Sequence, residues 1–341
     1  MSELPADERI EARLGPRFER VEIERRLHAV PPHEVYEVSV DGRRAVWKAS
    51  VTDRGAAGVE GRVLRFVGRE TSIPVPEVRD VGEDWFLAAY REDAPAEPAD
   101  DERVLDRSWL RIAGRTLATL HDEARFDRPG LLTIDGDPAD PASGIRVEAA
   151  TDGNRSGATP DAAWSATADT TWSDALDDLL RAYEASVVGT GYESAIADAR
   201  NFLVDHADRF DVLDGGAALC HGWFTPDHVG VAGDVTTCVI DFEHALAGSP
   251  EWDYWRTAVP LFQGGGWEGP DDAEGTFRDA YESVRPLPDG FDERADAYRA
   301  FVAASHIDSL ATQRGIDAET REVADFLAAY IGDTLDTVRN S

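Results

Sequence analysis

The sequence predicts an α+β protein, with strands concentrated in the first 92 residues and helices dominating the rest. Tyr36, Val38 and Val40 alternate with polar residues ahead of Asp41-Gly42, which is a strong signal for a hairpin turn. Beyond residue 102 the spacing changes. Apolar residues three and four positions apart there place one hydrophobic stripe on a helix over residues 104–123.

The remaining elements follow from the same two periodicities and from the residues that interrupt them. Pro31-Pro32 ends a first strand-like stretch, and Gly233-Asp234 marks the turn of a second hairpin. We expect strands over residues 21–30, 36–40, 45–49, 85–90, 229–231 and 235–240. We expect helices over residues 7–14, 56–69, 104–123, 174–185, 193–207, 294–310 and 322–338, with another beginning at Trp252. Residues 135–171, rich in Gly, Pro, Ala, Asp and Thr, are predicted to form a long surface excursion.

The chain is strongly acidic. Its 67 Asp and Glu residues outnumber 34 Lys and Arg, which gives a formal net charge of −33. A disordered acidic chain would lack the 9 tryptophans and 13 phenylalanines, so we expect a folded protein with the carboxylate-rich surface of a halophile. Molar salt shortens the Debye length to roughly 3 Å and screens the self-repulsion. The same charge argues against nucleic acid and anionic membrane as partners.

The sequence also sets the compartment that we expect. The first residues contain no basic and apolar run typical of a signal peptide, and no stretch reaches the roughly 18 apolar residues of a membrane span. We therefore expect a cytoplasmic protein. The two cysteines, Cys220 and Cys238, lie on opposite sides of the second predicted hairpin. We expect two small buried thiols, with a disulfide as the less favoured alternative.

Lys48 is the only lysine of the chain, since all other members of the Lys and Arg set are arginines. An ammonium is a compact point charge, whereas a guanidinium is a wide planar fork. A cramped phosphate site can therefore require the first and exclude the second. Alternation over residues 45–49 places Lys48 on the strand face opposite to Ala45, Trp47 and Ala49. The alternative is a surface lysine that remains by chance.

The stretch from Leu219 to Glu243 holds the densest polar chemistry of the chain. It contains a tight loop over residues 221–226, a short hairpin and then an acidic pair, Asp241 and Glu243. One residue separates the two acids at the end of a strand, so their side chains can face the same way. Carboxylates that leave a buried strand are costly without a cationic partner. A divalent metal that carries a nucleotide is one candidate.

This stretch resembles the catalytic segment of the aminoglycoside phosphotransferase and choline kinase-like family, relatives of the protein kinases. The family pattern His-Gly-Asp-x-x-x-x-Asn, a hairpin and Ile-Asp-Phe/Trp-Glu is matched by His221-Gly222, the hairpin and Ile240-Asp241-Phe242-Glu243. The segment Gly248-Ser249-Pro250-Glu251-Trp252-Asp253 resembles the family's Gly-Asp-Pro-x-x-Asp, whose last aspartate braces the catalytic loop. Residues 73–78, Ile-Pro-Val-Pro-Glu-Val, are similar to the family's connector Val-Pro-x-Val.

The resemblance implies a two-lobed, protein-kinase-like fold. A small N-terminal lobe with an antiparallel sheet would cover residues 1–92, a hinge residues 93–101, and a larger, mainly helical lobe residues 102–341. The resemblance also implies ATP and Mg²⁺ as cofactors and an unidentified small molecule with a hydroxyl group as acceptor.

The resemblance assigns roles to single residues as well. In such folds a lysine of the third strand pairs with the nucleotide phosphates and with a glutamate of the next helix, which gives these roles to Lys48 and Glu60. His221 is assigned to the nucleotide site. Asp241 and Glu243 are assigned to the metal.

Two positions depart from the family pattern. Trp223 stands where the family has its catalytic aspartate, and His228 where it has a metal-binding asparagine. An indole accepts no proton, and Mg²⁺ prefers oxygen to an imidazole nitrogen, so both departures weaken the expected chemistry. Asp227 or His228 itself could act as a relocated base. The expected phosphate-covering turn, residues 29–33, lacks glycine and contains Pro31-Pro32, which donates no backbone hydrogen bond.

These departures leave three functions open. The first is an active kinase of small-molecule hydroxyls, slowed by the loss of a base worth roughly 10²–10⁴-fold. The second is an inactive relative, a pseudokinase, that binds a nucleotide or a small ligand, with Trp223 stacking on it or plugging the cleft. The third is a scaffold, against which Lys48 and Asp241 argue. The first is favoured. The acceptor pocket, expected between residues 135–171 and the last helices, carries no motif.

Overall fold

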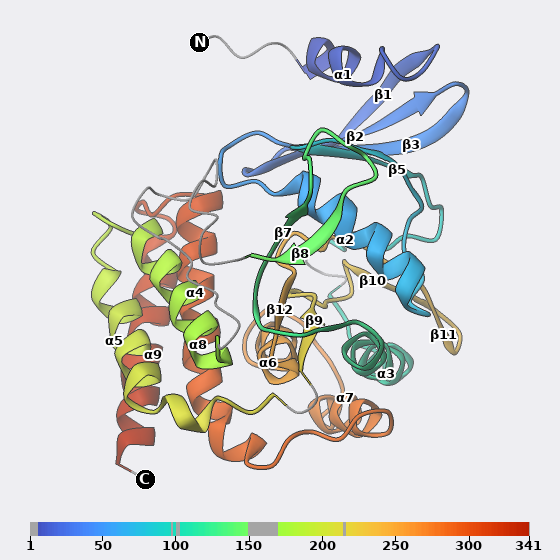
Figure 1. Cartoon of the computed structure of the whole chain (residues 1–341). Coiled ribbons are helices and arrows are strands. Elements are labelled where there is room, and N and C mark those ends of the chain that lie inside the picture. The colour runs from blue at the N-terminus through green and yellow to red at the C-terminus, as the bar shows by residue number, and fades with distance from the viewer. Residues whose placement is uncertain (1–5, 97, 100–102, 149–169, 214–215, 341) are drawn as a thin grey trace.

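The computed structural model describes residues 6–96, 98–99, 103–148, 170–213 and 216–340. An antiparallel sheet with its helices forms one end of the molecule, and a mainly helical body forms the other, as Figure 1 shows. The sheet comes first in the chain and the helical body follows. The predicted α+β order, with a small strand-rich lobe ahead of a larger helical one, is therefore confirmed.

The N-terminal lobe is built on five antiparallel strands in the order β1-β2-β3-β5-β4. Asp41 and Gly42 make the predicted turn between β2 and β3, with φ angles of 50° and 76°. The elements of this lobe are α1 (Ala6–Leu14), β1 (Val21–His28), β2 (His33–Val40), β3 (Arg43–Ser50), α2 (Ala57–Glu70), β4 (Val78–Val81) and β5 (Trp85–Ala89).

The two faces of this sheet are covered by different helices. Ile10 and Leu14 of α1 share one small core with Trp47 and with neighbouring apolar residues of the sheet. Helix α2 packs on the other face, against β3, β4 and β5. Lys48 lies on that second face and reaches Glu60 of α2. Alternation along β3 thus places the lysine as the sequence predicts.

The C-terminal lobe is mainly helical, and its helices pack in pairs: α3 with α7, α4 with α5, and α8 with α9. The sequence predicts all of these helices except α7. They are α3 (Arg107–Glu123), α4 (Trp172–Ser186), α5 (Glu193–Asp205), α6 (Pro250–Phe262), α7 (Ala273–Glu282), α8 (Phe291–Gln313) and α9 (Arg321–Arg339), with a short 3₁₀-helix, η2 (Ala207–Arg209).

A second antiparallel sheet, which the sequence does not predict, lies in this lobe. Its strands follow the order β6-β9-β12-β7-β8. Its strands are β6 (Arg125–Phe126), β7 (Gly130–Asp135), β8 (Gly144–Val147), β9 (Ala217–Cys220) and β12 (Leu246–Gly248). The predicted second hairpin is also present, as β10 (Val229–Ala232) and β11 (Val235–Val239). The strands of the second sheet are too short to show a periodicity.

The interpretation of residues 135–171 as one surface excursion is therefore partly wrong. The chain turns back after β7 and forms β8, so residues 144–147 belong to the sheet. Residues 149–169 of that stretch lie outside the described residues.

A buried arginine joins the β7–β8 turn to the N-terminal lobe. Arg62 of α2 is only 2% exposed. Its guanidinium donates hydrogen bonds at 2.7–3.1 Å to the backbone carbonyls of Gly58, Gly82, Pro138, Asp140 and Ser143. A buried guanidinium is tolerated when its N–H groups are satisfied, so this residue holds the turn against α2.

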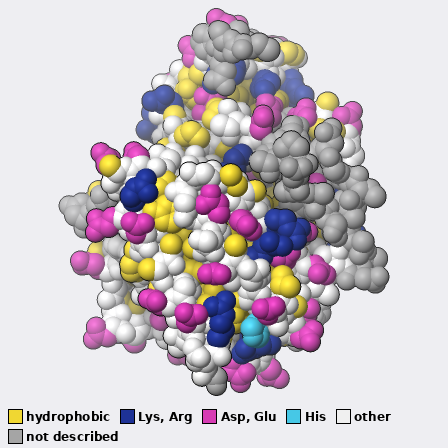
Figure 2. All heavy atoms as spheres, turned by 90° about the vertical axis from the view of Figure 1, so that its left-hand side faces the viewer, with side chains coloured by type: hydrophobic (Ala, Val, Ile, Leu, Met, Phe, Trp, Pro, Cys, Tyr) yellow, Lys and Arg dark blue, Asp and Glu magenta, His cyan; other side chains and the backbone are white. Residues whose placement is uncertain are grey.

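The surface agrees with the composition. In Figure 2, aspartate and glutamate side chains are spread over the visible face, with arginines among them, and do not gather into one patch. Within the described parts of the chain, none of the helices combines the length and apolar character needed to cross a membrane. Cys220 and Cys238 are both buried and free, as expected.

We predict that Arg62→Leu lowers the free energy of unfolding by at least about 3 kcal/mol, because it leaves buried carbonyls without donors. Arg69→Ala, on the exposed end of the same helix, should change it by less than about 0.5 kcal/mol. Denaturant unfolding in molar KCl measures both. Equal effects of the two substitutions would contradict the role given to Arg62.

Candidate active site

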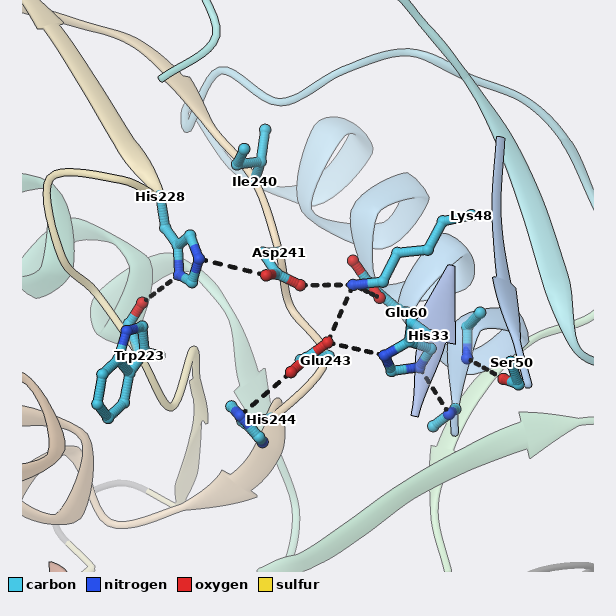
Figure 3. A network of polar contacts seen from close by, with 12 residues as sticks. His33, Lys48, Ser50, Glu60, Trp223, His228, Ile240, Asp241, Glu243 and His244 are labelled. Atoms are coloured by element: carbon cyan, nitrogen blue, oxygen red, sulfur yellow. Dashed lines mark hydrogen bonds and ion pairs between the residues drawn. The ribbon is translucent and has the colours of Figure 1, made fainter. Parts of the chain in front are cut away.

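Lys48 lies between the two lobes at the centre of a group of carboxylates. Its ammonium Nζ is 2.8 Å from Glu60 of α2, 2.6 Å from Asp241 and 3.1 Å from Glu243. Figure 3 shows these side chains converging on the ammonium from α2 and from the segment that follows β11. The predicted pairing of Lys48 with Glu60 and the shared direction of the two acids are confirmed as contacts.

The backbone after β11 turns sharply to bring both acids to the lysine. Asp241 has a φ of 65°, a left-handed conformation that an aspartate adopts at a cost. The strand before it is fixed at both sides, because Val239 donates a hydrogen bond to Pro74 O and Ile240 donates one to His228 O. The strained backbone conformation thus lies at Asp241, the residue that the resemblance assigns to the metal.

The charges of this group stabilise one another. Burial lowers the pKa of the Lys48 ammonium, but Asp241, Glu60 and Glu243 more than offset this and hold the pKa well above its usual value. Burial and Glu243 raise the pKa of Asp241, yet Lys48 and His228 bring it below the usual range. Burial raises the pKa of Glu60, even beside the lysine. Burial raises the pKa of Glu243 as well, but Lys48 and His33 hold it well below its usual range. The lysine and both acids after β11 are therefore charged at neutral pH.

His33 extends the group to the start of β2. Its Nε2 accepts a hydrogen bond of 3.2 Å from the backbone N–H of Ala56. A ring whose Nε2 accepts has its proton on Nδ1, and this Nδ1 lies 2.8 Å from Glu243 Oε2. His33 is 4% exposed and holds Glu243 toward Lys48. No pattern in the sequence indicates this role of His33, apart from its position after two prolines.

His228 joins the catalytic loop to the acidic pair. Its Nδ1 donates to Trp223 O at 2.9 Å, and its Nε2 lies 3.2 Å from Asp241 Oδ2. Burial lowers the pKa of His228, but Asp241 and Asp227 outweigh it and the pKa is raised. Both ring nitrogens are thus engaged, Nδ1 by the Trp223 carbonyl and Nε2 by the Asp241 carboxylate, so this geometry does not favour the predicted role of His228 as a base.

Asp227, the other predicted base, keeps a free basic atom. Its Oδ2 is 3.6 Å from His228 Nε2, and its side chain is 23% exposed. Its Oδ1 is buried, and none of the described residues donates a hydrogen bond to it. Of the two bases that the sequence suggests, Asp227 is thus the one with an oxygen available.

His221 holds the catalytic loop in place and does not point a free nitrogen outward. Its Nε2 hydrogen-bonds Ile240 O at 2.9 Å, Trp223 N donates to its Nδ1 at 3.3 Å, and the residue is fully buried. Burial and His228 lower the pKa of His221 to about 4. The structure therefore gives His221 a bracing position, and a direct contact with a nucleotide remains a prediction without support here.

Asp253 fixes the same loop from below. Its Oδ2 accepts from the backbone N–H of His221 at 2.6 Å and its Oδ1 from that of Gly222 at 2.7 Å. The loop needs glycine at this point, since Gly222 has a φ of 88° and a Cβ there would lie 2.6 Å from Cβ of His244. His121 of α3 contacts Asp253 Oδ2 at 3.0 Å.

Two carboxylates of this group suit a divalent metal. Asp241 and Glu243 together offer oxygen ligands, which Mg²⁺ prefers. Glu243, Glu60 and His33 also offer ligand atoms within 4.8 Å of one another. The Nδ1 of His33 carries a proton, however, and so has no lone pair for a metal. The residues present therefore fit a metal held by the two acids after β11 and carried in with a nucleotide.

Comparison with known proteins places this site in a family. Residues 33–287 match the Phosphotransferase enzyme family. The chain belongs to that family. The match includes Lys48, Glu60 and the whole segment from the catalytic loop to Asp253. No curated protein matches the chain in sequence.

Solved structures of the same fold cover almost the whole chain. The aminoglycoside phosphotransferase APH(4)-Ia superposes with a TM-score of 0.61 at 15% identity, over 97% of this chain and 99% of the other. A protein from Thermobifida fusca, provisionally described as a fructosamine-3-kinase, superposes with a TM-score of 0.59 at 19% identity, over 95% and 98%. The protein-kinase-like fold predicted from the resemblance is thereby confirmed.

We predict that His228→Asn, which restores the residue of the family pattern, changes how stability depends on pH. A histidine with a raised pKa stabilises the fold below its unfolded value of about 6.5, and this contribution is lost as pH rises through the raised value. Relative to the variant, the native chain should therefore lose thermal stability as pH rises from about 6 to about 9. A difference in melting temperature that stays constant with pH would contradict this charge on His228.

Proposed function

We propose that this chain transfers a phosphoryl group from ATP to a hydroxyl of a small molecule. The observation that supports it most is the contact of Lys48 with Glu60, Asp241 and Glu243 between the two lobes. In phosphotransferases of this kind a lysine held by a helix glutamate positions the phosphates. The carboxylates would hold the Mg²⁺ that accompanies the nucleotide and neutralises charge on the transferred group.

A cavity beside the predicted hinge offers a place for the nucleoside. Its volume is about 380 Å³. Pockets that combine apolar side chains with a few polar groups are typical of nucleotide and cofactor sites. The residues that line it are Asp93, Ala94, Pro95, Ala96, Trp109, Pro226, Val229, Gly230, Val231, Ala232 and Thr237.

Related structures agree with a site for both a nucleotide and an acceptor. Variants of APH(4)-Ia have been solved as ternary complexes, one with ADP and hygromycin B and one with AMP-PNP and hygromycin B. Their sequences are only 15–16% identical to this chain, so they support the nucleotide in the proposal and leave the acceptor open.

Asp227 is the residue that we propose as the base, because its Oδ1 has no hydrogen-bond partner among the described residues. It lies only four positions after Trp223 in the sequence. Proton removal by a positioned carboxylate contributes roughly 10²–10⁴-fold, and a misplaced one contributes less. The proposed enzyme is therefore slow.

A second candidate, a nucleotide-binding pseudokinase, is favoured by His228. The imidazole of His228, which stands where the family pattern has a metal-binding asparagine, contacts one carboxylate oxygen of Asp241. With Trp223 in place of the catalytic aspartate as well, the site lacks both the usual base and the usual asparagine ligand. Both candidates require the nucleotide at Lys48, and they differ only in turnover.

We predict that Lys48→Ala weakens ATP binding in the presence of Mg²⁺ by at least about tenfold, because it removes the positive charge that faces the phosphates. Arg43→Ala, an exposed cation on the same strand, is the matched control and should leave affinity unchanged. Calorimetry in molar KCl gives both values. Native binding that Lys48→Ala does not weaken would place the nucleotide elsewhere.

We predict that Trp223→Asp raises the turnover number by about 10²–10⁴-fold, since it places a carboxylate where the family has its catalytic base. Trp223→Asn has nearly the same shape without the basic oxygen and should show no such gain. Phosphate transfer from ATP is measured over a panel of sugars, cyclitols and amino alcohols at saturating acceptor. Equal turnover for the two variants would show that the base is not the missing element.

A further inference from the structure

Trp223 lies next to the charged group around Lys48, because its backbone carbonyl accepts a hydrogen bond from His228, which contacts Asp241. In Figure 3 its carbonyl points to His228 while its ring points away from the carboxylates around Lys48. The residue is half-buried, so part of the ring remains accessible. Because it occupies the position of the family's catalytic aspartate, an acceptor hydroxyl that reaches the phosphates must pass over or beside this indole.

A buried cation lies behind the ring. The guanidinium carbon of Arg256 is 5.6 Å from the centroid of the Trp223 ring and 5.7 Å from that of Trp252. Its Nε donates to Gly222 O at 2.8 Å, and its Nη1 donates to Ser305. The residue is 3% exposed, and no described carboxylate lies within ion-pair distance of it. Its positive charge is thus not neutralised by a direct partner.

The nearby acid is already paired. Asp308 of α8 receives a hydrogen bond of 2.7 Å from Nη2 of Arg54, which comes from the loop between β3 and α2. Arg54 also donates to Thr312, so it joins the N-terminal lobe to α8. Asp308 is 14% exposed and Arg54 is 40% exposed. The pair engages the Asp308 carboxylate, which is therefore not free to meet a cationic ligand.

The remaining titratable neighbour of the ring on α8 is uncharged. The imidazole of His306 lies 5.5 Å from Trp223, with the rings at 70°. Burial, with Arg256 and His244, lowers the pKa of His306 to about 3. It therefore fixes the indole by an edge contact and adds no charge at neutral pH.

The charges around the Trp223 ring, a buried Arg256 and a paired Asp308, contrast with the acidic surface of the chain. In the molar KCl used for the test below, the Debye length is roughly 3 Å, so surface carboxylates impose little of their potential on the cleft. A buried charge at the ring is screened much less. Ligand selection at Trp223 therefore depends on Arg256 and on the Arg54–Asp308 pair.

We propose that the acceptor is an uncharged polyhydroxylated ring, a pyranose or a cyclitol, that stacks on Trp223, and that Arg256 disfavours oligocationic acceptors. This inference rests on the proposed function in that it places the acceptor beside the phosphate site. A flat sugar or cyclitol face packs on an indole through its C–H groups, and its hydroxyls stay free for transfer. A cation would normally gain from the ring face, but Arg256 already takes that interaction.

The test measures ligand binding without ATP, by calorimetry and by tryptophan fluorescence in molar KCl. The probes are D-glucose, myo-inositol and deoxystreptamine, a cyclitol of similar size that carries ammonium groups. We expect at least one neutral ring to bind the native chain more tightly than deoxystreptamine does. Trp223→Ala should weaken that binding by about tenfold, and Trp223→Phe, which keeps an aromatic face, by much less.

Two controls make the result specific. Trp267→Ala removes another partly exposed tryptophan that also faces an arginine and should leave binding unchanged. Arg54→Ala frees Asp308 and should raise the affinity for deoxystreptamine, while Arg107→Ala, which breaks the exposed pair with Asp272, should not. The melting temperature of each variant confirms that it is folded.

Several results would overturn the inference. These are tighter binding of deoxystreptamine than of both neutral rings, no binding of either neutral ring up to its solubility, or equal binding by the native chain and Trp223→Ala. Because ATP is absent, the outcome is independent of phosphoryl transfer. Neutral rings that bind at Trp223 in a chain without turnover would support this inference and contradict the active-kinase proposal.

Discussion

The contact of one ammonium with three carboxylates is the constraint on which the site depends. Lys48 comes from the N-terminal sheet, Glu60 from α2, and Asp241 and Glu243 from the other lobe. A buried charge is costly unless its partners are held in place, and here the partners come from both lobes. The same contact therefore offsets part of the negative charge of the cluster and aligns the lobes, and His33 extends it to the start of β2.

The sequence was sufficient where a local pattern carries the information. Alternation along β3 placed Lys48 on the face of α2, and the order of strand and helix placed Glu60 within reach of it. The spacing of Asp241 and Glu243 predicted that both acids face one way, because side chains alternate at the end of a strand. The segment up to Asp253 identified the family, which the match over residues 33–287 confirms.

The remaining features depend on contacts between distant segments and leave no local pattern. The strands of the second sheet are two to six residues long and come from four parts of the chain, so neither periodicity reveals them. Arg62 and Arg256 are buried cations that bond backbone or hydroxyl oxygens, whereas sequence reasoning expects arginines on the surface. His228 was predicted as a base, but its contacts make it a link between the Trp223 carbonyl and the Asp241 carboxylate.

The most direct test of this account uses the fact that Lys48 is the only lysine. A chain labelled with ¹⁵N-lysine gives a single side-chain Nζ resonance, which reports on this ammonium alone. We expect a signal protected from solvent exchange, as for a buried and paired ammonium, that shifts when ATP and Mg²⁺ are added. A signal typical of an exposed lysine, or one that ATP leaves unchanged at saturation, would contradict the claim that Lys48 organises a nucleotide site.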